Sequence, residues 1–205
     1  MCKILGYGED ALTLWALKHR ISDILNKFKD TTTPSDCMVF YRPSFGRSGG
    51  KNSPEFGEFD AILVSLKNIY LVESKWDNLA ASKSEKNIIG PVQGLRHQIL
   101  SWYLTHWHRK YLKNWSKFVE YEGQNFKKAF NKPIASKGLL AKNLEFTLEA
   151  LLEHCKKLSG KQSIKNILLF FHKGRLSVRP IKPKDFTLVT INYGKYITGN
   201  FIALE

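Results

Sequence analysis

The spacing of apolar residues near the start of the chain predicts an amphipathic helix followed by a strand. Over residues 9–29, hydrophobic side chains recur every three or four positions and form one helical stripe. Polar residues 31–34 end this pattern, and a short apolar run at residues 37–41 then predicts a strand. The predicted stripe consists of Leu14, Leu17, Ile21, Ile24, Leu25 and Phe28.

Two apolar segments in the first half of the chain predict a β-hairpin. Residues 59–66 and 69–74 both have the composition of strands, and only Lys67 and Asn68 separate them. A connection of two residues is the length that tight hairpins use. We therefore expect these two strands to pair in the antiparallel sense.

The pattern of the second half predicts helices first. Gly90 and Pro91 open a long helix that continues as far as Glu120, because proline is favoured at the first helical position. Residues 138–158 predict a further helix. No repeat or linker divides the chain, so we expect one domain.

Strands follow these helices. An almost continuous apolar run at residues 164–172 is typical of a strand buried on both faces, and the chain then turns toward residues 176–179. Residues 186–193 and 196–203 predict a last strand pair around Gly194. This order of helices and strands indicates an α/β protein.

Composition narrows the class of protein. The 205 residues are 43% hydrophobic and 13% aromatic, which is enough to bury the core of one domain. No apolar run approaches the roughly 18 residues of a membrane span, and no signal peptide follows Met1, so we expect a cytoplasmic protein without a membrane partner. Three widely spaced cysteines, Cys2, Cys37 and Cys155, argue against a disulfide framework and a zinc site.

The charge balance indicates a polyanionic partner. The chain has 32 Lys and Arg against 18 Asp and Glu, a formal net charge of +14. Each cation that meets a phosphate releases condensed counterions, which favours binding to nucleic acid. A lysine-rich composition that serves only solubility is the alternative.

Three charged residues at the ends of the predicted hairpin indicate a reaction. Asp60 begins one strand, while Glu73 and Lys75 end the other and share a face because side chains alternate along a strand. Two converging carboxylates suit a hard cation such as Mg²⁺, and a neighbouring lysine can orient water or stabilise phosphoryl charge. This predicts metal-assisted phosphodiester hydrolysis. The alternative is an exposed Glu73–Lys75 pair on an edge strand, which would contribute less than about 1 kcal/mol.

Phe59-Asp60, twelve intervening residues and Glu73-Ser74-Lys75 together resemble the motif of the PD-(D/E)XK nucleases, also called restriction-endonuclease-like. Phe59 replaces the family's proline, and the resemblance covers residues 6–110 and 164–172. It implies an α/β restriction-endonuclease-like core with a central mixed β-sheet flanked by helices, to which this chain adds extra helices and a β-rich C-terminal tail. The expected single nuclease domain has a core at residues 6–110 and 164–180, a helical insertion at 111–163 and a C-terminal β segment at 181–205.

The resemblance also implies further site residues. Glu9 matches an acidic residue of the first helix that joins the metal site in many members, and its spacing from Leu12 and Ala16 turns it toward the sheet. The alternative for Glu9 is a first-turn carboxylate favoured by the helix dipole. Gln93, with Gln98 behind it, matches a glutamine of the later helix. The expected catalytic set is Glu9, Asp60, Glu73, Lys75 and Gln93, with Glu9, Asp60 and Glu73 as ligands of Mg²⁺ or Mn²⁺.

The segment at residues 42–54 is rich in glycine, serine and basic residues. It resembles the flexible basic loop that lies beside the nucleic acid in resolvases and restriction enzymes of this family. The resemblance implies phosphate contacts by Arg42, Arg47 and Lys51, with glycines that let the backbone approach closely. An ordinary exposed loop is the alternative.

The histidines and the aromatic residues of the long helix are not expected to take part in catalysis or metal binding. His106 and His108 point about 200° apart on a helix and cannot share a metal ion. His172 ends the predicted buried strand and is expected to be a hydrogen-bonded structural histidine. The aromatic residues of the long helix are expected in a core rather than as a surface for bases or a dimer: Trp102, Tyr103, Trp107, Tyr111 and Trp115.

The expected function is a Mg²⁺-dependent DNA endonuclease that resembles a restriction enzyme. A Holliday-junction resolvase, another structure-specific, repair or viral nuclease, and an RNA endonuclease of the same fold are alternatives. A non-catalytic nucleic-acid-binding protein is an alternative of another class. Carboxylates beside phosphate cost affinity unless a cation bridges them, which disfavours the pure binding protein. Whether the chain forms a homodimer is left open.

Overall fold

The computed structural model describes residues 3–47, 49–77, 89–156, 163–176 and 180–204. The chain forms two compact units. We call the first the sheet unit; it comprises Met1–Tyr41, Asp60–Gly90 and Lys161–Glu205. The second is the helical unit, made of Arg42–Phe59 and Pro91–Gly160. Residues 42–59 and 91–110 thus group with the helices, whereas the sequence interpretation assigned them to the core.

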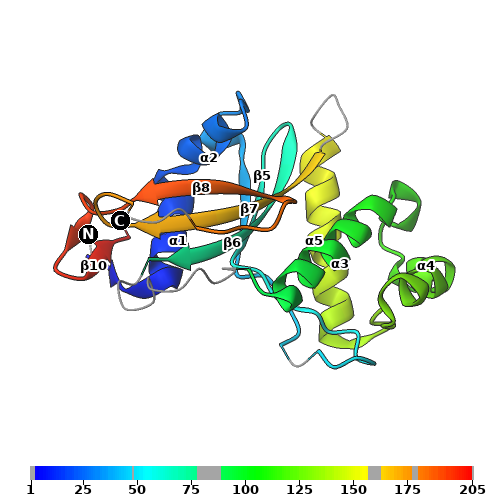
Figure 1. Ribbon diagram of the computed structural model, residues 1–205. Coiled ribbons are helices and arrows are strands. Elements are labelled where there is room, and N and C mark those ends of the chain that lie inside the picture. Colours follow the sequence, from blue (N-terminus) through cyan, green and yellow to red (C-terminus); the bar gives the residue numbers. More distant parts are fainter. Residues whose placement is uncertain (1–2, 48, 78–88, 157–162, 177–179, 205) are drawn as a thin grey trace. The chain divides into compact units, whose positions relative to one another are not determined.

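A five-stranded mixed sheet forms the centre of the sheet unit (Figure 1). Its strand order is β2-β5-β6-β7-β8. The pairs β2–β5 and β5–β6 are antiparallel, whereas β6–β7 and β7–β8 are parallel. This confirms the predicted hairpin and the α/β class with a mixed central sheet. The strands span Met38–Tyr41 (β2), Ala61–Val64 (β5), Asn68–Trp76 (β6), Ser163–His172 (β7) and Phe186–Asn192 (β8).

Two helices cover one face of this sheet, α1 (Gly8–His19) and α2 (Ile21–Lys27). The single helix predicted for residues 9–29 is therefore interrupted at Arg20, whose φ of −129° is not helical. Because α2 restarts after this break, one continuous stripe does not describe both helices. Leu14 is 36% exposed, contrary to the prediction, and α1 instead buries Ala11, Leu12, Trp15, Ala16 and Leu17.

The opposite face of the sheet is also apolar. Leu168 and Phe170 of β7 pack there with Phe186 and Leu188 of β8 and with Ile89. The intervening residues of β7, Ile167, Leu169 and Phe171, face the α1–α2 side. The strand is therefore buried on both faces, which explains its almost continuous apolar sequence and confirms the prediction.

The C-terminal strands differ from the prediction. A separate antiparallel sheet has the order β1-β10-β9, formed by Leu5–Gly6, Phe201–Ala203 and Ile197–Thr198. The predicted pairing of residues 186–193 with 196–203 is wrong, because β8 pairs with β7. The apolar residues of β8 pack on both faces of the central sheet. A two-stranded hairpin at the surface could not bury both of these faces. Of the predicted strand at residues 176–179, positions 177–179 lie outside the described residues.

Three helices make up most of the helical unit: α3 (Pro91–His106), α4 (Trp115–Phe130) and α5 (Gly138–Lys156). A 3₁₀ turn at Arg109–Tyr111 separates α3 from α4, so the predicted helix at 91–120 is two helices. Asn114 accounts for the second start, because its side chain accepts a hydrogen bond from the Lys117 N–H at 3.1 Å and caps α4. In the same unit, β3 (Ser44–Phe45) pairs with β4 (Gly57–Glu58).

Aromatic side chains fill the interior of the helical unit. The predicted aromatic core is confirmed for Tyr103, Trp107, Tyr111 and Trp115, which are all buried, whereas Trp102 is partly exposed and packs against Phe126. Phe118 of α4 contacts each of these four rings, with centroids 5.0 to 6.1 Å apart.

Across the described parts of the chain, no helix is long and apolar enough to cross a membrane.

Candidate active site

Asp60 and Glu73 lie across from one another at one end of the β5–β6 hairpin. The register pairs Ala61 with Val72, and one further step along it sets Asp60 opposite Glu73. Residues opposite each other in an antiparallel pair have side chains on the same face. The Asp60 Oδ2 atom also accepts a hydrogen bond of 2.6 Å from the Ser74 backbone N–H. The two carboxylates that the sequence placed at the hairpin end are therefore neighbours.

Burial and neighbouring negative charge both act on these carboxylates. Burial raises the pKa of Asp60 to about 6, and the negative charge of Glu73 acts in the same direction. The Ser74 N–H and the Lys75 ammonium oppose this shift in pKa. Glu73 is only 1% exposed. A buried acid beside a part-buried one carries a cost of desolvation and charge repulsion that a bound cation would relieve.

Lys75 follows Glu73 on the same face of β6 and meets a third carboxylate. Its Nζ atom lies 3.4 Å from Glu9 Oε1, and the Trp76 N–H donates to Glu9 Oε2 at 3.0 Å. Glu9 belongs to the first turn of α1, so the start of this helix is joined to the end of β6. Glu9 therefore contacts the Lys75 ammonium and the Trp76 backbone amide. The helix dipole alone does not account for the position of the Glu9 side chain.

The alternative of an exposed pair on an edge strand does not hold for Glu73 and Lys75. Strand β6 lies between β5 and β7, and Glu73 is buried. Lys75 also forms an ion pair with Glu9 of α1. The acid and the lysine are therefore set at the end of an interior strand.

The residues present fit a magnesium ion held by two carboxylates. Within the described ranges, no group of three or more His, Cys, Asp or Glu side chains is arranged to hold a metal ion. Mg²⁺, however, is commonly bound through one or two carboxylates, with water and substrate phosphates as the remaining ligands. Asp60 and Glu73 meet that requirement. The contacts of Glu9 favour a role in positioning Lys75 over the role of metal ligand that the sequence predicted for Glu9.

Gln93 belongs to the first turn of α3 in the helical unit and is partly exposed, while Gln98 on the same helix is exposed. The three carboxylates and the lysine described above belong to the sheet unit. The role expected for Gln93 stays a prediction.

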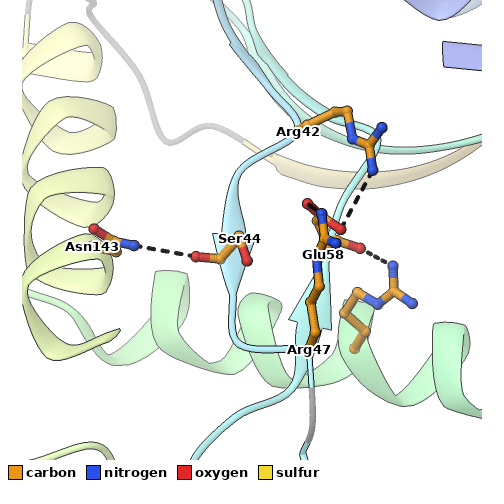
Figure 2. A network of polar contacts seen from close by, with 6 residues as sticks. Arg42, Ser44, Arg47, Glu58 and Asn143 are labelled. Atoms are coloured by element: carbon orange, nitrogen blue, oxygen red, sulfur yellow. Dashed lines mark hydrogen bonds and ion pairs between the residues drawn. The ribbon is translucent and has the colours of Figure 1, made fainter. Parts of the chain in front are cut away.

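The basic segment, residues 42–58 of the helical unit, is organised around Glu58 (Figure 2). The Arg47 guanidinium lies 2.9 Å from Glu58 Oε1, and the Arg42 guanidinium lies 3.5 Å from Glu58 Oε2. The hydrogen bond from Arg47 lowers the pKa of Glu58, and the charges of both arginines add to this effect. Two of the three cations expected on phosphate thus converge on one carboxylate, while Lys51 is exposed.

A buried lysine that the sequence analysis missed fixes this segment. Lys132 follows α4, is 7% exposed, and donates to the carbonyl oxygens of Gly50, Ser53 and Glu55. A Cβ atom at Gly49 would lie 2.3 Å from the Glu55 carbonyl oxygen, so the fold of the segment itself requires glycine there. No local pattern marks Lys132, because its partners lie about 80 residues earlier in the chain.

Histidines take structural positions, as expected. The His106 ring stacks on Trp102 with centroids 4.0 Å apart, and its Nδ1 atom lies 2.8 Å from the Trp102 carbonyl oxygen. His172 is 9% exposed, and its Nδ1 atom lies 3.0 Å from the Gly174 carbonyl oxygen. Neither histidine contributes to the carboxylate cluster.

The described site therefore consists of buried Glu73, the neighbouring part-buried Asp60, and a lysine held by a third carboxylate, all within the sheet unit. No family model, curated protein or solved structure matches the chain. Arguments about function therefore depend on the chemistry of these side chains.

Proposed function

We propose that the protein is a Mg²⁺-dependent endonuclease that hydrolyses DNA phosphodiester bonds and has a restriction-endonuclease-like core. The observation that carries this proposal is the position of Asp60 beside buried Glu73, with Lys75 two residues further along the same strand. Acids whose pKa is raised by burial and by a second acid are common at functional sites. Here they occur together with a lysine on the same face.

The topology of the sheet unit supports the fold proposed. Helix α1 precedes the three antiparallel strands β2, β5 and β6, and β7 then adds to β6 in parallel. The resemblance implies the order helix, three strands, helix and strand; here two helices precede these strands, and α3, α4 and α5 follow β6 before β7. The motif residues lie at the end of the β5–β6 hairpin.

Each side chain has a distinct part in the proposed reaction. Asp60 and Glu73 would hold the magnesium ion, which when bound would supply Lewis-acid charge stabilisation and an activated water. Lys75, on the same face as Glu73, orients the attacking water or neutralises charge on the phosphoryl oxygens. Glu9 is a positioning residue, because it contacts Lys75 and the backbone of Trp76.

The competing class, a nucleic-acid-binding protein without catalysis, accounts less well for the buried acids. Asp60 and Glu73 would repel phosphate and also destabilise the fold without a cation. A net charge of +14 supports nucleic acid as partner in both cases and does not separate them. The argument for catalysis therefore rests on the two carboxylates.

Cleavage assays on three substrates test the proposal. Supercoiled plasmid, four-way junction DNA and structured RNA are each incubated with Mg²⁺, with Mn²⁺ and with EDTA. The parent protein should cleave DNA with either metal ion and not in EDTA. Preference for the junction would indicate a resolvase, and cleavage of RNA alone would make the protein a ribonuclease.

A pair of variants links any activity to the site. Glu73→Ala should abolish cleavage, whereas Glu120→Ala, which removes an exposed acid of α4, should leave it intact. Full activity in Glu73→Ala, or no metal-dependent cleavage of any substrate by the parent protein, would contradict the proposal.

A further inference from the structure

Tyr7 contacts two other aromatic rings beside the candidate active site, Trp76 edge-on and Phe201 at a tilt; we call Tyr7, Trp76 and Phe201 the aromatic platform. The ring centroids of Tyr7 and Trp76 are 5.5 Å apart, and those of Tyr7 and Phe201 are 6.0 Å apart. Tyr7 is 58% exposed and Phe201 is 47% exposed. Aromatic side chains this exposed, in contact with one another, form an apolar patch that requires an explanation.

The platform is continuous with the residues of the proposed site. Trp76 directly follows Lys75, and its backbone N–H donates to Glu9. Tyr7 immediately precedes α1, two residues before Glu9. The same hydrogen bonds and ion pair that join α1 to β6 therefore also set the rings next to Glu9 and Lys75.

The rings are held by ordered structure. The Trp76 indole N–H donates to the Tyr193 hydroxyl at 2.7 Å. Tyr7 follows β1 and Phe201 begins β10, and these strands pair, with Leu5 opposite Ala203. Figure 1 shows this small sheet at the end of the central sheet toward which the arrows of β6, β7 and β8 point. A rigid aromatic surface loses little conformational entropy when a ligand stacks on it.

The charges around the platform favour a nucleic acid strand over an apolar protein segment. Lys3, Lys18 and Lys195 are exposed residues of the sheet unit that lie near β1, β10 and β9 in the chain or in contacts: Lys3 precedes β1, Lys195 precedes β9, and Lys18 donates to the Leu204 carbonyl oxygen just after β10. Exposed cations beside exposed rings are the combination that binds single strands, in which bases stack and phosphates meet positive charge.

We propose that the aromatic platform stacks on unpaired bases next to the phosphodiester bond that is cut, so that the substrate is single-stranded or locally unpaired nucleic acid. In a paired duplex each base face is covered by its neighbours, and only an unpaired base can present a face to Tyr7 or Phe201. This inference rests on the proposed nuclease function for its position relative to the bond, and it deepens that function by naming a substrate class.

Binding to a fluorescent oligonucleotide tests the inference without cleavage. A single strand carrying 2-aminopurine, and the blunt duplex of the same sequence, are titrated with protein in EDTA. Stacking on the platform should quench the 2-aminopurine of the single strand. Tyr7→Ala should weaken single-strand binding about tenfold and remove the quenching, while duplex affinity stays unchanged. Tyr7→Phe, which keeps the ring, should bind as the parent does.

Two further variants separate stacking from folding. Phe201→Leu keeps an apolar side chain on β10 but removes the aromatic face, so it should also weaken single-strand binding. Tyr121→Ala is the matched control, because Tyr121 is a tyrosine of α4 that is 60% exposed. It should change neither affinity nor quenching.

Distinct outcomes contradict the inference and the nuclease proposal. Parental single-strand binding by Tyr7→Ala and Phe201→Leu, or equal losses on single strand and duplex, would overturn the platform. A change of oligomeric state in these variants with unaltered DNA binding would assign the surface to protein association and would overturn it too. Quenching that depends on Tyr7 supports stacking whether or not the strand is cut, whereas absence of metal-dependent cleavage counts against the nuclease alone.

Discussion

Lys75 and Glu9 form an ion pair, with 3.4 Å between Nζ and Oε1, that connects the end of β6 to the first turn of α1. Both side chains are about one-third exposed, at 27% and 35%, so the pair itself contributes little to stability. Its consequence is geometric. Glu9 restricts the ammonium to the end of β6 where Glu73 and Asp60 also lie.

Glu9→Gln distinguishes a positioning residue from a metal ligand. Glutamine can still accept the hydrogen bond from Trp76 but no longer attracts Lys75 by charge. We expect kcat to fall about tenfold, with Mg²⁺ affinity unchanged in calorimetric titration. A loss of Mg²⁺ affinity in Glu9→Gln would instead return Glu9 to the ligand set that the sequence predicted.

Asp60→Asn should stabilise the protein while it abolishes cleavage. Burial and the charge of Glu73 raise the pKa of Asp60 to about 6, so the folded state binds this proton more tightly than the unfolded state does. The contribution of Asp60 to stability therefore falls as the pH rises from about 4 to above 6. At pH 7 in EDTA, we expect the free energy of unfolding to rise by on the order of 1 kcal/mol.

Urea denaturation of Asp60→Asn and of the exposed-site control Glu120→Gln measures this effect. The control should match the parent protein in both stability and activity. A destabilised Asp60→Asn protein would mean that the hydrogen bond from Ser74 outweighs the cost of the buried charge.

Asp30 provides a stability test of opposite sign. Its carboxylate accepts hydrogen bonds from the side chains of Ser65, Thr32, Tyr70 and Asn68, at 2.6 to 2.9 Å. Burial alone would raise the pKa of Asp30, but these hydrogen bonds outweigh it and hold the pKa well below its usual range. The stability that they provide is present above about pH 4 and is lost as the pH falls toward the folded-state pKa.

Asp30→Asn should therefore destabilise the sheet unit at neutral pH. Hydrogen bonds to a charged group contribute about 1.5 to 3 kcal/mol each, and we expect a net loss of about 2 kcal/mol in the free energy of unfolding. The difference from the parent protein should shrink between pH 7 and pH 3. A difference that is the same at both pH values would show that the charge of Asp30 is not what stabilises the sheet unit.

If the basic segment binds nucleic acid as proposed, Glu58 competes with phosphate for Arg42 and Arg47. Glu58→Gln removes the carboxylate that both arginines contact, so DNA affinity at low salt should rise and depend more steeply on salt. Replacing Arg42, Arg47 and Lys51 together should make the dependence shallower, by about 0.9 in the slope of log K against log salt for each phosphate that these cations no longer neutralise. An unchanged slope in both proteins would remove the basic segment from the nucleic acid interface.

Local pattern was sufficient to predict the centre of the site. Alternation along β6 put Glu73 and Lys75 on one face, and the predicted antiparallel hairpin brought Asp60, at the start of one strand, near the end of the other. The exact register was not predicted, because a connection at Lys67 and Asn68 would pair Leu66 with Ile69, whereas Val64 pairs with Ile69. Both inferences depend on residues less than about 20 positions apart, where chain geometry leaves few alternatives. The continuous apolar run of β7 was equally informative, because burial on both faces leaves no polar positions.

Contacts between distant segments could not be predicted in this way. Periodicity states which face of an element is apolar and not which element covers it. The pairing of β1 with β10 joins the two ends of the chain, and β8 adds to β7 although β9 and β10 follow it directly. Lys132 reaches Gly50 by the same kind of contact. The grouping of residues 42–59 with the helices depends on such contacts.

Lys75→Ala tests the third position of the motif. A lysine on the face of Glu73, held by Glu9, should act on the attacking water or on the phosphoryl oxygens, and its loss should leave the two carboxylates in place. We expect single-turnover cleavage at saturating Mg²⁺ to slow by about 100-fold or more. Metal affinity measured by calorimetry should stay nearly the same.

Lys75→Arg adds a stricter requirement to that test. Arginine keeps the positive charge opposite Glu9, but its planar guanidinium has a fork of donors and does not reproduce a compact ammonium. We therefore expect incomplete recovery of the rate, which separates a specific role in catalysis from a general effect of charge. If Lys75→Ala cleaves at the parental rate, or if only metal affinity changes, Lys75 has no part in the chemistry and the match at this position of the motif is accidental.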